Sequence, residues 1–102
     1  MTNRRERDMK GYWIARGDVT DEALYREYGK RALPVIETFG GRLIVLGGRA
    51  TTPEGRDWAR NVVIEFDSYE QALACYDAPE YQAALSYAKR ASDRELFIVE
   101  GV

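Results

Sequence analysis

Glu65 is the residue of this sequence whose type and position most clearly could do chemistry. It lies in residues 61–66, a short segment that is otherwise mostly apolar and rich in β-branched side chains, which predicts a strand. Side chains of a strand alternate between two faces, so Glu65 shares a face with Asn61 and Val63. Burying a carboxylate on that face of the strand costs free energy unless the carboxylate is paired or protonated. Glu65 is therefore a candidate general base or ligand anchor, and the alternative is a structural ion pair.

Three arginines are candidates either to pair with Glu65 or to hold an anionic ligand: Arg16, Arg49 and Arg60. Arg49 follows two glycines, which let the backbone turn sharply and place the arginine at the end of a strand. A guanidinium there can hold a carboxylate or an enolate through two parallel hydrogen bonds. The alternative for Arg49 is a simple turn with a surface ion pair. Two glycines without a following helix do not make a phosphate-binding loop.

Tyrosine is unusually frequent, with seven residues against three phenylalanines. Tyr28 and Tyr76 lie on helix faces that are predicted to turn inward, and we expect these two to line a cavity. The alternative is that they are core residues whose hydroxyls reach the rim of the domain.

The residue types that are missing exclude several kinds of chemistry. The chain has no histidine, which excludes histidine-ligated haem, histidine zinc sites and triads with an imidazole base. Cys75 is the single cysteine, so an intrachain disulfide and a multi-thiolate metal site are excluded as well. We expect Cys75 to be a small buried hydrophobe in a helix. No metal and no cofactor is expected, and proton transfer would depend on carboxylate, tyrosine, lysine, water or the substrate itself.

Length and charge indicate a single domain and argue against binding to nucleic acid or to an anionic membrane. At 102 residues and a formal charge of -2, the chain fits one domain without the basic surface that nucleic acid or an anionic membrane would need. It contains no run of about 18 apolar residues, so no membrane span is expected, and the cytoplasm is the predicted location. Residues 1–8 are polar and charged, which predicts a flexible N-terminal tail before a single domain at 9–102.

The candidate residues are positioned by elements that can be read from periodicity and caps. Strands are predicted over 10–19, 42–46, 61–66 and 96–99. A first helix is predicted between a cap at Thr20 or Asp21 and the glycine pair 40–41. A second helical region starts at Ser68, breaks before Pro79 and ends near Ala91. The order is therefore βαββαβ.

This order predicts an α+β, ferredoxin-like fold with a four-stranded antiparallel sheet and the helices on one face. The other face would then expose Tyr12, Ile14, Val63 and Phe97, a larger apolar patch than a monomer usually shows. Pairing two such faces about a two-fold axis is the simplest way to cover it, so a homodimer is expected.

Several short motifs resemble the family of domain of unknown function 1330. The resemblance extends from Met9 to Val102, and it rests on these motifs in this order: Lys10-Gly11-Tyr12-Trp13-Ile14-Ala15, Gly40-Gly41-Arg42, Gly47-Gly48-Arg49, Val63-Ile64-Glu65-Phe66 with Ser68, and Tyr76 followed by Pro79-Glu80-Tyr81. It implies the dimeric α/β barrel fold, whose superfamily includes cofactor-free monooxygenases, lactone isomerases and haem-dependent peroxidases. It implies no particular activity, and the first eight residues lie outside it.

Two functional hypotheses follow. In the first, the homodimer has a small-molecule site for an organic acid or enolisable compound, as in a cofactor-independent enzyme. Arg49 and Arg60 would hold the anion, Glu65 would move a proton, and Tyr28 and Tyr76 would form an apolar wall, with Arg16 nearby. In the second, the protein is a non-catalytic binding or accessory homodimer whose polar residues only set the register of the two chains.

Overall fold

The structure is a computed structural model that describes residues 9–102; the segment 1–8, predicted to be a flexible tail, lies outside the described residues. Seven elements follow one another along the chain: β1 (Gly11–Val19), α2 (Glu22–Thr38), β2 (Arg42–Leu46), β3 (Arg60–Phe66), α3 (Tyr69–Asp77), α4 (Pro79–Ala91) and β4 (Ser92–Glu100). Asp21 caps α2 by accepting from the amide of Leu24, and Ser68 caps α3 by accepting from Gln71. Pro79 begins α4, where its missing amide costs nothing.

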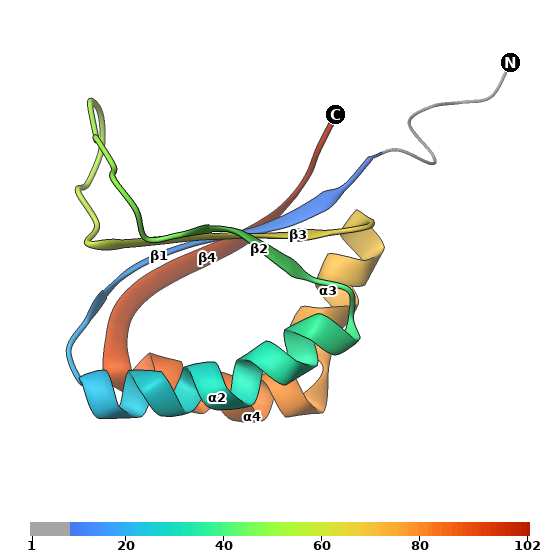
Figure 1. The fold of residues 1–102 in the computed structure, drawn as a ribbon, viewed down its shortest axis with the longest axis horizontal. Coiled ribbons are helices and arrows are strands. Elements are labelled where there is room, and N and C mark those ends of the chain that lie inside the picture. Colours follow the sequence, from blue (N-terminus) through green and yellow to red (C-terminus); the bar gives the residue numbers. More distant parts are fainter. Residues whose placement is uncertain (1–8) are drawn as a thin grey trace, which may run out of the picture.

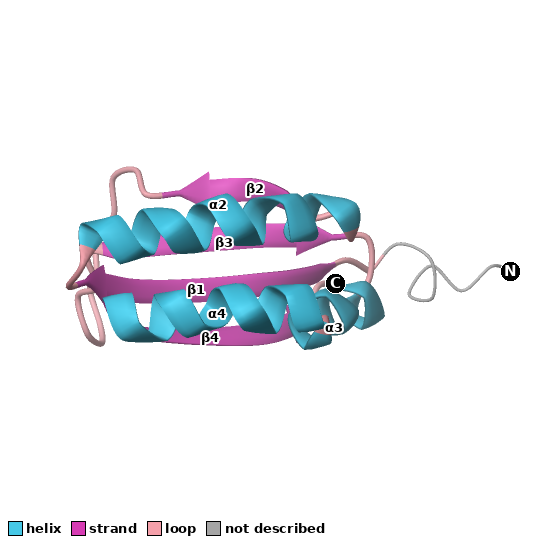
Figure 2. Cartoon of the chain, turned by 90° about the horizontal axis from the view of Figure 1, so that it is seen from below, coloured by secondary structure: helices cyan, strands magenta, loops and turns pink. Residues whose placement is uncertain are grey.

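The four strands form one antiparallel sheet in the order β2-β3-β1-β4. All three helices cover the same face of this sheet, and the other face is left open (Figure 1). Seen from the helical side, α2 and α4 run next to each other along the direction of the strands, with α3 at one end (Figure 2). The predicted ferredoxin-like α+β arrangement is confirmed.

Strand register decides which side chains meet the helices. Trp13 of β1 pairs with Ile64 on one side and Ile98 on the other, and these three point into the helical layer. Tyr12 pairs with Glu65 and Val99, one position along, and therefore lies on the open face. The structure thus confirms the prediction that β3 has one apolar face and one face that carries Glu65.

The core is built around Trp13, which is 1% exposed. Its ring contacts Phe66 and Tyr81 with centroid distances of 5.3 and 4.8 Å. Its indole nitrogen donates to the carbonyl oxygen of Ala72 at 2.9 Å, which satisfies the buried polar atom and fastens α3 to β1. Cys75 is fully buried as predicted, and burial raises the pKa of its thiol to about 12, so it stays protonated and unreactive.

The fourth strand begins earlier than its apolar residues indicate. We expected it to start at Leu96, but β4 begins at Ser92, directly after α4. Residues 92–95 are all polar, which is typical of a loop, yet they pair with β1 as far as Val19. Pairing in the sheet outweighs local polarity here. As a result Arg94 is a strand residue on the helical face.

The open face is apolar in the middle and charged at its edges. Ile14, Val45, Val63, Phe97 and Val99 form the centre, where Phe97 is 49% exposed. Ion pairs within the chain flank it, among them Arg16 with Glu95 at 2.6 Å and Arg56 with both Asp18 and Asp93 at 2.8 and 3.0 Å. In the described part of the chain, no helix has the length and apolarity that crossing a bilayer requires.

Candidate functional site

An apolar cleft of about 130 Å³ lies between α2 and the helical face of the sheet. A larger but more polar hollow of about 300 Å³ lies between α4 and β4, where Tyr76, Asp93 and Arg94 are among its lining residues. A cavity of about 150 Å³ lined by apolar side chains holds one benzene, so this cleft is the size of a single aromatic ring. One wall comes from α2 and the other from the inward side chains of all four strands. It is lined by Trp13, Ala15, Tyr25, Tyr28, Gly29, Ala32, Leu33, Ile36, Leu43, Leu46, Val62, Ile64, Arg94 and Leu96.

The cleft exists because small residues face one another across it. Ala15 on β1 and Gly29 and Ala32 on α2 occupy positions where larger side chains would fill the space. Its mouth lies between α2 and the edge strand β2, where Leu33 is 41% and Leu46 is 65% exposed. An apolar ligand can therefore enter from solvent along the edge of the sheet.

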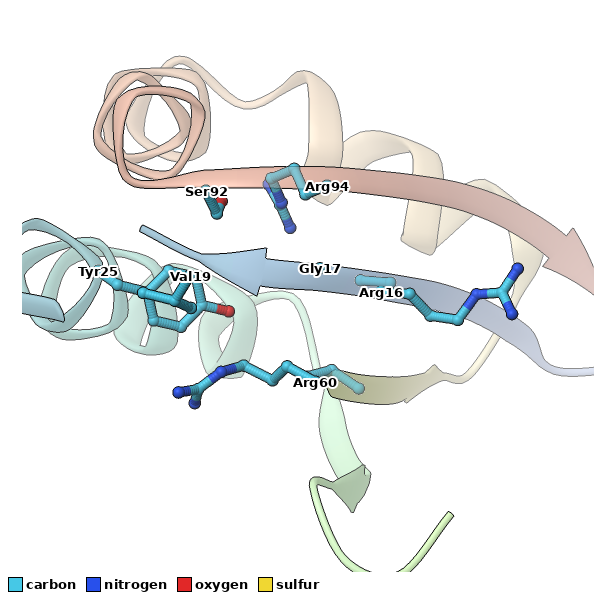
Figure 3. A pocket seen from close by; sticks show the side chains of 9 residues that line it. Arg16, Gly17, Val19, Tyr25, Arg60, Ser92 and Arg94 are labelled. Atoms are coloured by element: carbon cyan, nitrogen blue, oxygen red, sulfur yellow. The ribbon is translucent and has the colours of Figure 1, made fainter. Parts of the chain in front are cut away.

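Arg94 provides the polar end of the cleft. Its guanidinium carbon lies 5.3 Å from the centre of the Tyr28 ring. The hydroxyls of Tyr28 on α2 and Tyr81 on α4 are hydrogen-bonded at 2.9 Å. Figure 3 shows the side chains of Arg94 and Tyr25 approaching each other from β4 and α2. A cation and three phenols thus converge at the end of an otherwise apolar space.

Arg94 has no acidic partner in the described part of the chain. No carboxylate of residues 9–102 lies within 4.0 Å of its guanidinium. The other two half-buried arginines, Arg16 and Arg60, each have one, in Glu95 and Glu22. Burial opposes the charge of Arg94, but Tyr28 and Tyr81 outweigh it and raise the pKa of Arg94 above its ordinary value. Arg94 is therefore a permanent, unneutralised positive charge.

The phenols beside Arg94 are hydrogen-bond donors at neutral pH. Burial raises the pKa of Tyr81 far above its usual range, and burial followed by the nearby Tyr28 raises the pKa of Tyr25. The described residues that line the cleft include no carboxylate. The site can bind an anion and stabilise negative charge on oxygen, and proton removal there would depend on water.

A small hollow of about 10 Å³, roughly the room one water needs, adjoins the same end. Tyr25, Arg60 and Arg94 line it (Figure 3). Arg60 lies over the Tyr25 ring, with its guanidinium carbon 4.9 Å from the ring centre. A second cation is therefore close to the polar end, although Glu22 lies 3.8 Å from it.

The structure brings two of the predicted site residues together, Tyr28 and Arg60, at the two sides of this polar end. The side chain of Arg16 points away from Tyr25 and Arg60 (Figure 3) and pairs with Glu95 on the open face. Arg49 is exposed in the connection between β2 and β3. Tyr76 packs against Trp13 at a ring distance of 5.9 Å, outside the lining of the cleft.

Glu65 lies on the opposite face of the sheet from the cleft. Arg42 of β2 donates to it at 3.0 Å, and the Tyr12 hydroxyl donates to it at 3.0 Å. Arg42 first and Tyr12 second hold the pKa of Glu65 below its ordinary value, so it stays ionised. We expected Arg16, Arg49 or Arg60 as its partner, and that expectation was wrong because the register pairs Arg42 with Glu65. Neither Glu65 nor Arg49 is among the described residues that line the small hollow beside Arg60.

Sequence reasoning missed Arg94, Tyr25 and Tyr81 as members of one site. A signal for Arg94 does exist, because Ser92, Arg94, Leu96 and Ile98 alternate with period two and point the same way. Extending the strand backward along that alternation would have placed Arg94 on the helical face.

An antiparallel four-stranded sheet with helices on one face and an apolar cleft beneath them defines a ferredoxin-like α+β protein. The chain belongs to the DUF1330 family, a domain of unknown function, which it matches over residues 10–102. The comparison with curated proteins gives no match.

Three solved structures show where the fold recurs. A protein of unknown function from Rhodopseudomonas palustris is 18% identical, with a TM-score of 0.74 over 94% of this chain and 85% of that one. A protein from Bacteroides fragilis, described as dimeric and ferredoxin-like, is 17% identical, with a TM-score of 0.57 over 91% and 96%. SnoaB, a cofactor-independent oxygenase from Streptomyces nogalater, is 15% identical, with a TM-score of 0.55 over 88% and 90%.

Proposed function

We propose that the protein is a cytoplasmic homodimer that binds a single-ring organic acid, phenol or enolisable compound in the cleft under α2. The observation that carries this proposal is Arg94, a half-buried cation at the end of an apolar space with no carboxylate of the described residues beside it. A buried charge without a partner is costly. An anionic group on the ligand would supply the missing partner through charge-assisted hydrogen bonds.

The tyrosines add an ordered set of donors to this proposal. The Tyr28 and Tyr81 hydroxyls share one hydrogen bond in which either can be the donor. Because the Arg94 guanidinium can only donate, its presence beside Tyr81 favours the order in which Tyr81 donates to Tyr28. In this order the Tyr28 hydroxyl proton remains available to the ligand oxygen. Arg94 and Tyr28 together would bind the oxygen that carries the negative charge, as an oxyanion site does.

The catalytic form of the proposal is proton loss from an enolisable ligand. The C–H bond next to the carbonyl breaks, its proton passes to solvent water, and the electron pair stays on the ligand as an enolate whose oxygen lies against Arg94. SnoaB shows that a protein of the same fold is a cofactor-independent oxygenase, which supports chemistry of this kind without a bound cofactor.

The proposal is tested with 4-nitrophenol, whose phenolate form is coloured. Its pKa bound to the protein is measured by absorbance in a pH titration with protein in excess. Binding should lower this pKa by roughly one unit, because a cation close to the oxygen favours the charged form. Arg94→Gln should abolish the shift, and Tyr28→Phe should reduce it.

Arg90→Gln is the matched control, since it removes one arginine from the exposed surface of α4 outside the cleft lining. It should bind 4-nitrophenol and shift its pKa as the natural chain does. Absence of binding, or an equal shift with Arg94→Gln, would refute the proposal.

The homodimer is supported by the apolar centre of the open face, and the fold recurs in a Bacteroides fragilis protein described as dimeric. Two sheets packed through this centre would cover Phe97 and its neighbours and leave the cleft, on the other side of each sheet, accessible.

A non-catalytic accessory homodimer is the second candidate, and the environment of Glu65 favours it. The polar groups of the open face are paired within the chain, as Arg42 with Glu65 and Arg16 with Glu95 show. Such internal pairs fix the shape of a docking face and need no ligand. If 4-nitrophenol and simple aromatic acids all fail to bind while the dimer forms, this candidate is the one that stands.

A further inference from the structure

Gly29 stands in the middle of α2, where a glycine weakens the helix relative to alanine. The usual structural reasons for a glycine do not apply to it. Its φ is not positive, unlike those of Gly40, Gly47, Gly48 and Gly55. A Cβ built on Gly29 would meet no atom within 4 Å, so no neighbouring element in the described structure requires the close approach that only glycine permits.

Gly29 does line the cleft. On a helix, residues four apart lie one above the other, so Tyr25, Gly29 and Leu33 form one row along the cleft wall. Tyr25 is at the polar end of this row, and Leu33 is at the mouth. The gap in the row lies midway between the solvent opening and Arg94. A side chain at position 29 would occupy the path between them.

We propose that Gly29 is a specificity-determining residue, which keeps room for one aromatic ring against the backbone of α2 while the anionic group of the ligand reaches Arg94. This inference rests on the proposed function of the cleft. The volume of about 130 Å³ leaves little spare room around one ring. Each carbon added to the side chain at position 29 therefore reduces the volume that is available to the ligand. The class of ligand is thus flat, single-ring and anionic at one end.

The experiment compares 4-nitrophenol binding by the natural chain, Gly29→Ala and Gly29→Leu. Affinity should fall about threefold with alanine and at least tenfold with leucine, following the volume added. Thermal unfolding is measured on the same samples. Gly29→Ala should raise Tm by several degrees, because alanine favours the helix and nothing clashes with its methyl group. Weaker binding in a more stable protein separates loss of space from loss of folding.

Ala83→Leu is the control for added bulk, because Ala83 is exposed on α4 and does not line the cleft. It should bind as the natural chain does. Unchanged affinity in both Gly29 variants, with the natural chain binding normally, would overturn this inference alone. Failure of the natural chain itself to bind would overturn the proposed function and this inference with it.

Discussion

At the scale of single residues, Arg42 and Arg94, on the two faces of the sheet, differ in whether a carboxylate neutralises them. Glu65 and Arg42 neutralise each other on the open face, whereas Arg94 on the helical face lies beside phenols and pairs with no carboxylate of residues 9–102. A satisfied pair can stabilise the fold, but only an unsatisfied charge is ready for a ligand. An arginine without a carboxylate partner therefore indicates the candidate ligand site better than an arginine in an ion pair does.

We predict that Glu65→Gln lowers stability in a pH-dependent way and leaves 4-nitrophenol binding unchanged. The pKa of Glu65 is lower in the folded chain than its ordinary value of about 4.3. Its contribution is therefore fully present above that pH and is lost as the pH falls through the folded pKa. The urea midpoints of the two proteins, measured at fixed concentration, should differ most near pH 6 and converge as the pH falls through the folded pKa of Glu65.

An equal difference between the two proteins at pH 6 and pH 3 would contradict this assignment. A loss of 4-nitrophenol binding in Glu65→Gln at pH 7 would instead return Glu65 to the ligand site.

At the scale of elements, α2 matters most because it supplies Tyr25, Tyr28 and Gly29 to the cleft. Its first turn is held by Asp21, which accepts from the Leu24 amide at 3.1 Å. Because Tyr25 lies one turn after this cap, the cap also positions the Tyr25 ring against the guanidinium of Arg60. The start of one helix thus sets one wall of the site.

Asp21→Ala should therefore destabilise the protein by about 1 kcal/mol, the usual cost of losing a cap side chain. Asp21→Asn should be nearly neutral, since asparagine also accepts from the first-turn amides. Urea unfolding of the two variants and the natural chain checks this. Equal destabilisation by both substitutions would show that the charge of Asp21, and not its capping oxygen, is what counts.

Local patterns were sufficient for most elements and insufficient for the site. Caps, glycine pairs and alternation predicted the order βαββαβ and the face of Glu65, because each is a property of nearby residues. Arg42 was missed as its partner because cross-strand register joins residues 23 positions apart. Arg94 was missed because polar residues at the start of β4 are typical of a loop. The cleft depends on Ala15, Gly29 and Ala32 facing one another, which only the packed fold shows.

At the scale of the whole molecule, the two faces of the sheet differ in what they present. The helical face contains the cleft, and the open face presents an apolar centre with charged edges. Association through the open face would leave the mouth of the cleft, beside Leu33 and Leu46, accessible. The homodimer was predicted from the mismatch between sheet area and helix cover, but the predicted site combined Glu65 with Tyr28, and these two residues lie on opposite sides of the sheet.

Phe97→Asp should convert the dimer into monomers, because it puts a charge at the centre of the face that is proposed to pair. Light scattering at micromolar concentration should then report the mass of one 11.7 kDa chain instead of two. Ala83→Asp adds the same charge on the exposed surface of α4 and should leave the mass unchanged. A natural chain that is already monomeric would refute the proposed assembly.

The register of the edge strand β2 shifts between Leu43 and Val45, so Ile44 has no partner on β3. This bulge turns Val45 outward and lets Leu46 reach the cleft, and it also bends the free margin of the sheet. A bent margin is a poor template for lateral addition of further strands. Although all five residues of β2 are exposed, we expect this irregularity to disfavour growth into fibrils by edge-to-edge strand pairing.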